Sequence, residues 1–172
     1  SFSGGFRFRL EDDAGMLWLT VRERVYRQLK TADGLRPGAQ VRASGLISLL
    51  GQELQLTLAA PADLVLLVPG AAPAGPPTPI GQIGLAQYGQ TLTVAGQIVE
   101  VEAFTTGTRL TLSDGSGTLY LLLWSNVLAF TPDKERLVAG AQVRATGQVE
   151  QYQAVMEIVP QLGLDVAVLA GP

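Results

Sequence analysis

The chain has 172 residues, of which 47% are hydrophobic and 16% are charged, and it contains neither cysteine nor histidine. This length and composition fit one mid-sized domain or two small ones with a packed core. The missing residue types exclude disulfides, thiol or imidazole catalysis, and zinc sites built from cysteine or histidine. The net charge of −3 argues against a protein that holds nucleic acid by bulk electrostatic attraction.

Charge is unevenly divided along the chain. Residues 1–68 carry eight Lys or Arg and seven Asp or Glu, whereas residues 69–172 carry four and eight. A polyanion is therefore expected to prefer the first half of the chain. No apolar run approaches the roughly 20 residues that a helical membrane span needs, so no membrane span is predicted.

The first predicted element is a β-hairpin over residues 6–22, FRFRLEDDAGMLWLTVR. Apolar residues at positions 6, 8 and 10 alternate with charged residues at 7, 9 and 11, which is the period of a strand with one buried face. The EDDAG segment supplies residues that favour a tight turn. In the second strand we expect Leu17, Leu19 and Val21 to point inward and Met16, Trp18, Thr20 and Arg22 to point outward.

The next segment, RERVYRQL, does not alternate and predicts a short helix, because Val25, Tyr26 and Leu29 stand at helical spacing. A Pro-Gly turn and a strand follow, with a bend expected at Gly45. Another strand is predicted over residues 53–59, and an apolar strand-like tail then closes this part of the chain.

The same pattern recurs 102 residues later without gaps. The segment GAQVRA occurs at residues 38–43 and again at 140–145, and Arg7 aligns with Arg109. A six-residue identity inside a longer ungapped register rarely arises by chance, so we interpret the chain as an internal duplication. In the second copy we expect Leu119, Leu121 and Leu123 to point inward and Thr118, Tyr120, Leu122 and Trp124 to point outward.

A proline-rich stretch, PGAAPAGPPTP, lies between the copies and is expected to be a semi-extended spacer. The predicted division is a first domain over 1–68, a linker over 69–80 and a second domain over 81–172. The second copy begins with an additional strand over 89–103, kinked at Gly96. The first copy has no counterpart, so we expect its domain to be incomplete and interpret the chain as part of a longer one.

Each complete copy thus predicts three strands, a helix and two further strands. The expected fold is all-β with one short helix per repeat: two tandem five-stranded barrels of the OB type, the first lacking its N-terminal strand. Five segments resemble the OB-fold nucleic-acid-binding family typified by the anticodon-binding domains of aminoacyl-tRNA synthetases. They are LTVAGQIVEV, TRLTLSDGSGTLYLLLW and LVAGAQVRATGQV in the second copy, and FRFRLEDDAGMLWLTV and LRPGAQVRASGLI in the first.

In barrels of this type the ligand lies across the second and third strands, and the resemblance implies single-stranded DNA or RNA as the ligand. Outward arginines can contact phosphates, and an outward aromatic ring can stack on a base. The hypothesis is a nucleic-acid-binding protein that uses chiefly its first barrel. Its predicted contact residues are Arg7, Arg9, Trp18, Thr20, Arg22, Arg109, Tyr120 and Trp124.

A second hypothesis is a structural or assembly module in a larger protein or envelope complex. Tyr120, Leu122 and Trp124 would then contact a protein partner, because apolar outer faces are typical of protein–protein contacts. The sequence leaves open whether the chain forms an oligomer. The compartment is open too, with a cytoplasmic location favoured over a secreted or cell-envelope one. The residue usage resembles that of a high-GC bacterium.

The sequence predicts no catalytic activity, no cofactor and no metal site. Asp12, Asp13 and Asp114 raise the question of a metal site, but they stand in predicted turns, which favour aspartate for backbone reasons. The hydroxyls of Ser113 and Ser116 have no histidine to activate them. We therefore expect a protein that is not an enzyme.

Overall fold

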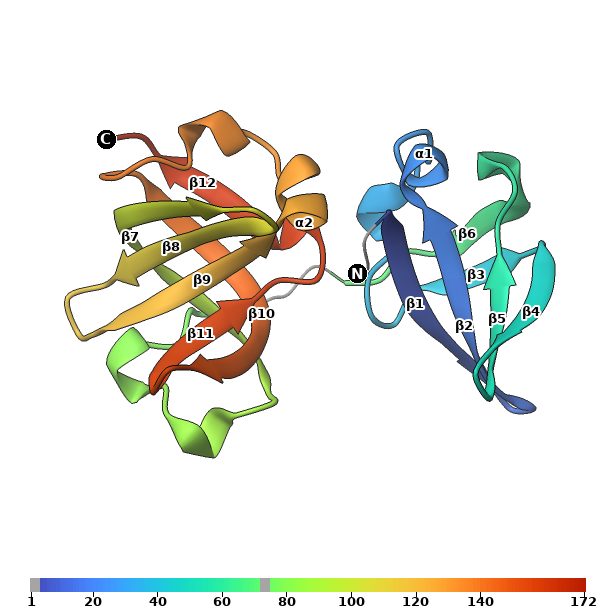
Figure 1. Cartoon of the computed structure of the whole chain (residues 1–172), viewed down its shortest axis with the longest axis horizontal. Helices are drawn as coiled ribbons and strands as arrows, with labels where there is room; N and C mark the ends of the chain where they lie inside the picture. Colours follow the sequence, from blue (N-terminus) through green and yellow to red (C-terminus); the bar gives the residue numbers. More distant parts are fainter. Residues whose placement is uncertain (1–3, 72–74) are drawn as a thin grey trace. The chain divides into compact units, whose positions relative to one another are not determined.

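The computed structural model describes residues 4–71 and 75–172 of the chain. The chain forms two compact units, Ser1–Ala72 and Pro73–Pro172. Strands dominate both units, and the described part of each contains one short α-helix, α1 (Glu23–Tyr26) or α2 (Ser125–Ala129) (Figure 1). The predicted all-β class with one helix per repeat is confirmed. No helix of the described residues is long and apolar enough to cross a membrane.

The second unit is a closed barrel (Figure 1). Its sheet has the order β11-β9-β8-β7-β10-β12, and β11 also pairs with β10, which closes the sheet on itself. β11 runs parallel to β9, whereas the other pairings are antiparallel. The strands are β7 (Thr91–Phe104), β8 (Gly107–Ser113), β9 (Thr118–Trp124), β10 (Gln142–Tyr152), β11 (Val155–Val159) and β12 (Val166–Ala170).

The long strand β7 makes this closure possible because it pairs with β10 through its first half and with β8 through its second half. The register shifts between Ile98 and Glu100, two residues beyond the glycine at which the sequence predicts a kink. A Cβ atom at Gly96 would lie 2.8 Å from the Ser113 carbonyl oxygen, so the bend needs glycine at this point.

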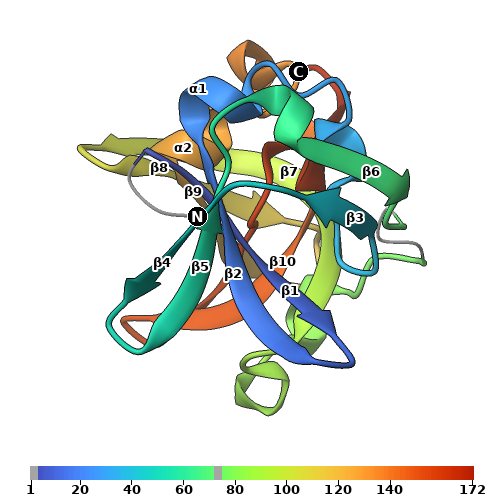
Figure 2. The same ribbon diagram turned by 90° about the vertical axis from the view of Figure 1, so that its right-hand side faces the viewer.

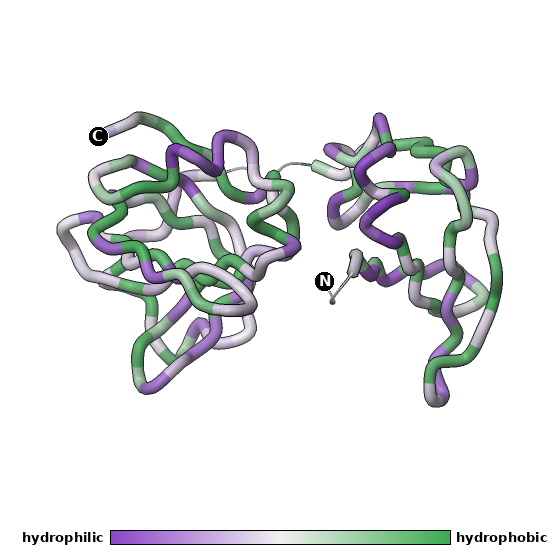
Figure 3. The backbone as a smooth tube through the Cα atoms, turned by 45° about the horizontal axis from the view of Figure 1, so that its top comes forward, coloured by the Kyte–Doolittle hydropathy of each residue, from purple (hydrophilic) through white to green (hydrophobic). Residues whose placement is uncertain are grey.

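The core of the second unit consists mainly of the inward residues of the alternating strands. Hydrophobic and hydrophilic stretches follow one another along the backbone of both units (Figure 3). The predicted inward leucines all lie in this core, with Val94 and Ile98 of β7 packed among them. The fully buried leucines are Leu110, Leu112, Leu119, Leu121 and Leu123.

The first unit repeats this arrangement in an open form. It contains a four-stranded sheet, β1-β2-β5-β4, and a separate pair, β3-β6 (Figure 2). Shifted by 102 residues, β3 and β4 correspond to the two halves of β10, here separated by Ser44 and Gly45. The strands are β1 (Gly5–Asp12), β2 (Gly15–Arg22), β3 (Gln40–Ala43), β4 (Leu46–Leu50), β5 (Glu53–Thr57) and β6 (Leu64–Val68).

Among the described residues the first unit has no counterpart of β7, as predicted. β1 pairs only with β2, and β3 pairs only with β6, so each has one strand edge without a partner strand in the described part of the chain. The inward residues near these edges are correspondingly less buried. Ile47 is 62% exposed, whereas Val149, its equivalent in the second unit, is 0% exposed.

Short 3-10 helices connect the strands. The linker ends before residue 80, its predicted last residue, because Ile80 in η3 is buried in the core of the second unit. The Ile80 amide donates to the Asp114 carboxylate at 2.8 Å, and the Thr78 amide donates to the Thr93 carbonyl at 2.7 Å. These helices are η1 (Ala32–Gly34), η2 (Pro61–Asp63), η3 (Ile80–Gln82), η4 (Leu85–Gln87), η5 (Lys134–Arg136) and η6 (Gly163–Asp165).

Replacing Ile80 by alanine should destabilise the second unit by roughly 2–5 kcal/mol, because it leaves a cavity in the core. The chain contains two tryptophans, so in a Trp18→Phe background the fluorescence of Trp124 reports on the second unit alone. Urea unfolding followed by this signal measures the effect. Leu85→Ala, at an exposed position in η4, is the control. Equal midpoints for both variants would show that Ile80 does not anchor the segment.

Candidate functional site

Strand register places the predicted contact residues of the first unit on the outer face of its sheet. Arg7 is opposite Thr20, and Arg9 is opposite Trp18, whereas Leu19 is buried on the inner face. Directly opposed residues share one face of a sheet, so these four side chains lie together. We call this surface the Arg7 face. Its polar and aromatic residues are Arg7, Arg9, Trp18, Thr20, Arg22, Ser48, Glu53 and Gln55.

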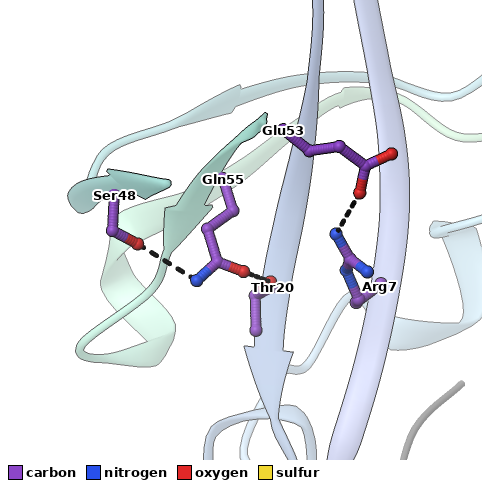
Figure 4. A network of polar contacts seen from close by, with 5 residues as sticks. All are labelled: Arg7, Thr20, Ser48, Glu53 and Gln55. Atoms are coloured by element: carbon purple, nitrogen blue, oxygen red, sulfur yellow. Dashed lines mark hydrogen bonds and ion pairs between the residues drawn. The ribbon is translucent and has the colours of Figure 1, made fainter. Parts of the chain in front are cut away.

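Arg7 and Trp18 form a packed pair at the centre of the Arg7 face. The Arg7 guanidinium carbon lies 4.7 Å from the centroid of the Trp18 ring, which is a cation–π geometry. One Arg7 Nη contacts a Glu53 carboxylate oxygen at 3.3 Å (Figure 4). The Arg7 Nε and the Trp18 Nε1 are buried and have no hydrogen-bond partner. The pair therefore retains hydrogen-bonding capacity that the described residues do not use.

Thr20 lies on the Arg7 face and contacts Gln55. It is buried, and its hydroxyl donates to the Gln55 side-chain oxygen at 3.3 Å. The Gln55 amide nitrogen in turn donates to the Ser48 hydroxyl at 3.0 Å (Figure 4). The structure thus gives Thr20 an orienting contact with Gln55, and it adds Gln55 and Ser48, which the sequence did not single out, to the face.

The remaining arginines of the Arg7 face are exposed. Arg9 forms an ion pair with Glu11 at 2.8 Å, in which both side chains are more than half exposed. Arg22 is exposed at the end of β2, directly before α1. Exposed ion pairs contribute only about 0–1 kcal/mol, so Arg9 can exchange its carboxylate for another anion at little cost.

The second unit carries an equivalent Arg109 face with a different set of charges. The Arg109 guanidinium lies 5.0 Å from the Tyr120 ring and 4.5 Å from the Tyr152 ring, and it contacts Glu102 at 3.0 Å. The sequence did not reveal Tyr152, because its equivalent in the first copy is a leucine. Cross-strand pairing defines the Arg109 face as Glu100, Glu102, Arg109, Thr111, Tyr120, Leu122, Glu150, Tyr152 and Glu157.

Glu157 is the unusual group of the Arg109 face. It is 5% exposed, and its Oε2 has no hydrogen-bond partner. It stands opposite Glu150 on β10 and next to Tyr120 on β9. Burial raises the pKa of Glu157, the charge of Glu150 raises it further, and Arg109 partly offsets both effects. At the equivalent positions, the Arg7 face has the neutral Gln55 and Ser48.

The three residues predicted to dock a protein partner, Tyr120, Leu122 and Trp124, differ in their solvent exposure. Leu122 lies on the outer face, opposite Arg109, but only 6% of it is exposed, so the expectation that it offers apolar surface is not met. Tyr120 is partly buried. Trp124 is 38% exposed and packs edge-on against Phe104, with ring centroids 6.1 Å apart.

The aspartates of the two hairpin turns bind backbone amides. An Asp12 oxygen accepts from the amides of Ala14 and Gly15 at 2.8 and 3.1 Å. Asp114 accepts from the Ser116 hydroxyl and from backbone amides that include Ile80, and these bonds lower its pKa to about 2. The described residues contain no group of three acidic side chains placed to hold a metal ion.

Comparison with known proteins identifies the fold. No protein-family model matches the chain, and no curated protein matches it. Among solved structures, asparaginyl-tRNA synthetase from Pyrococcus horikoshii, complexed with asparaginyl-adenylate, aligns with a TM-score of 0.50 and 14% identity over 56% of this chain and 23% of that chain. The chain is built from OB folds. The resemblance drawn from the sequence is thereby confirmed at the level of the fold.

Two further similar structures are less closely superimposed. The OBody AM1L10, bound to hen egg-white lysozyme, has a TM-score of 0.47 and 21% identity over 60% of this chain and 99% of that chain. A replication protein A heterotrimer bound to single-stranded DNA has a TM-score of 0.34 and 17% identity over 40% of this chain and 51% of that chain.

Replacing Glu157 by glutamine should stabilise the second unit at neutral pH. A folded-state pKa above the ordinary value of 4.5 means that the ionised carboxylate disfavours folding above that pKa, whereas below pH 4.5 both states are protonated and the penalty disappears. We expect the melting temperature to rise by a few degrees at pH 7, since about 1 kcal/mol shifts it by roughly 4–8 °C in a small domain.

Thermal unfolding of the Trp18→Phe background at pH 7 and pH 4 measures this difference. Glu135→Gln, at an exposed position of η5, is the matched control. A Glu157→Gln variant that melts below its parent at pH 7 would contradict the assignment of Glu157 as a destabilising charge.

Proposed function

We propose that the chain is a non-catalytic protein that binds single-stranded nucleic acid, DNA or RNA, chiefly through the Arg7 face of the first unit. The observation that carries this proposal is the Arg7–Trp18 pair, with an unpaired buried donor on each partner and two exposed arginines beside it. Single strands are bound without strict sequence preference by this combination of positive charge and stacking surface.

Arg7 and Trp18 would act together on one nucleotide. The ion pair between Arg7 and Glu53 is partly exposed and therefore weak, so a phosphate can replace Glu53 at the guanidinium. A base can stack on the planar guanidinium and extend the existing stack on Trp18. Arg9 and Arg22 would bind the neighbouring phosphates.

The neutral residues around the pair favour the first unit over the second. Ser48 and Gln55 stand where the Arg109 face has Glu150 and Glu157. Carboxylates at these positions would repel a phosphate backbone, whereas a hydroxyl and an amide can donate hydrogen bonds to it. The charge difference between the two halves of the sequence thus lies partly in the two faces themselves.

Trp18→Ala should weaken oligonucleotide binding by roughly 1–3 kcal/mol, the contribution of one stacked base. Fluorescence anisotropy of labelled oligothymidylate and oligouridylate at low salt measures the affinity and compares DNA with RNA. In a Trp124→Phe background, the fluorescence of Trp18 should also change on binding. A dissociation constant weaker than about 10⁻⁴ M would reject the proposed function.

Arg9→Ala should reduce the dependence of binding on salt. Each phosphate contact with a single strand contributes about 0.7 to the slope of log K against log salt concentration, so losing one contact lowers the slope by that amount. The matched control is Arg24→Ala, which removes the same charge from an exposed position on α1. Equal slopes in the two variants would remove Arg9 from the proposed interface.

A second candidate function is an assembly module that docks a protein through the second unit. The exposed Trp124 at the end of β9, which packs against Phe104 at the end of β7, favours it. Under this candidate, Trp124→Ala should weaken association with the partner and leave oligonucleotide affinity unchanged.

A further inference from the structure

The Arg109 face combines acidic groups with aromatic rings. Glu100, Glu102, Glu150 and Glu157 all project from the same side of the sheet as Arg109, as their cross-strand pairing shows. Acidic side chains on a protein surface are common and do not by themselves make a site. Two further features distinguish this group.

The first feature is the unsatisfied carboxylate of Glu157. Buried carboxylate oxygens are normally hydrogen-bonded, and leaving one without a donor costs free energy. The Oε2 of Glu157 is buried with no donor, and the nearest paired residue on β10 is another glutamate, Glu150. Arg109 contributes favourable charge, but the hydrogen bond that it donates goes to Glu102, and its buried Nε has no partner. Glu157 therefore lacks a donor that an incoming cationic group can supply.

The second feature is that the fold does not require these acids. In the first unit, the residue equivalent to Glu157 is Gln55, which is hydrogen-bonded to both Thr20 and Ser48 (Figure 4). The residue equivalent to Glu150 is Ser48. The same sheet thus forms with neutral, mutually satisfied side chains, so the acidic pair in the second unit is not explained by folding.

The ring geometry indicates which cation fits. Tyr120 and Tyr152 already hold the guanidinium of Arg109 at 5.0 and 4.5 Å. Tyr152 is 41% exposed at the end of β10, so part of its ring remains open to a second planar cation. A guanidinium carries five N–H donors in a fixed plane and can bind two carboxylates while it stacks on a ring.

We propose that the Arg109 face binds an arginine-containing segment of a partner protein, with one guanidinium of that segment bridging Glu150 and Glu157 next to Tyr152. Charge complementarity selects this partner, and the unsatisfied Glu157 oxygen receives the missing hydrogen bond. The proposal concerns a different unit from the one assigned to nucleic acid, so either can fail without the other. It also specifies what the second candidate function, protein docking through the second unit, would bind: an arginine side chain of the partner.

The test uses the full chain and a labelled octa-arginine peptide as the probe, with octa-citrulline as its uncharged isostere. Fluorescence anisotropy at low salt should show binding of octa-arginine and much weaker binding of octa-citrulline. The double variant Glu150→Ser/Glu157→Gln should reduce the affinity about tenfold or more. It should fold normally, because both new residue types occur at these positions in the first unit.

The matched control is Asp133→Asn/Glu135→Gln, which removes two negative charges from exposed positions near η5. It should leave the affinity within about twofold of the parent, as expected for weak effects of distant surface charges. Equal losses in the two double variants would mean that net charge alone attracts the peptide and would overturn the proposal. Binding of octa-citrulline as tight as that of octa-arginine would overturn it as well.

A second measurement locates the peptide. Chemical-shift changes in the amide spectrum should concentrate on β9, β10 and β11, and Trp18→Ala should leave peptide affinity unchanged. Shifts confined to the first unit, or a peptide affinity that falls with Trp18→Ala, would contradict the proposal. Oligonucleotide binding of the Glu150→Ser/Glu157→Gln variant reports on the first unit and separates this failure from failure of the proposed function.

Discussion

The two-residue period of paired strands controls both the stability and the surface chemistry of this protein. Because opposed residues share a face, the register that places Leu19 and Leu121 inside also places Trp18 and Tyr120 outside. A slip of one residue would exchange the two sets, burying arginine and exposing leucine. The apolar core thus holds the outer faces in position, and each arginine–aromatic pair follows from the packing beneath it.

This dependence explains why much of the architecture could be predicted from the sequence. Alternation in the hairpins and the 102-residue repeat identified the strands, the helices, the OB fold and the sides on which Arg7 and Arg109 lie. The solvent exposure of an outward side chain could not be predicted from alternation. Leu122 is outward by alternation, but it is buried.

Some residues of the two faces were not predicted, because contacts between distant parts of the chain place them there. Gln55 and Glu157 join the faces through the pairing of β5 with β2 and of β11 with β9, which are not adjacent in the chain, and Tyr152 follows because β10 pairs with β11. Ile80 follows a stretch without periodicity, and its amide donates a hydrogen bond to Asp114, which lies far along the sequence. Only Ile80 carried a signal, as an isolated large aliphatic residue at the end of a proline-rich segment.

The one-sided pairing of β1 and β3 has a consequence for handling the protein. Strand edges without a partner are templates for intermolecular sheet formation, and the exposed Ile47, Leu49 and Leu50 lie on β4, which is itself an edge strand of the four-stranded sheet. Aggregation in concentrated solution will therefore start in the first unit, while slow hydrogen–deuterium exchange concentrates in β7, β8 and β9 of the closed barrel. A charged substitution on the exposed side of β4 is the natural way to keep samples dispersed.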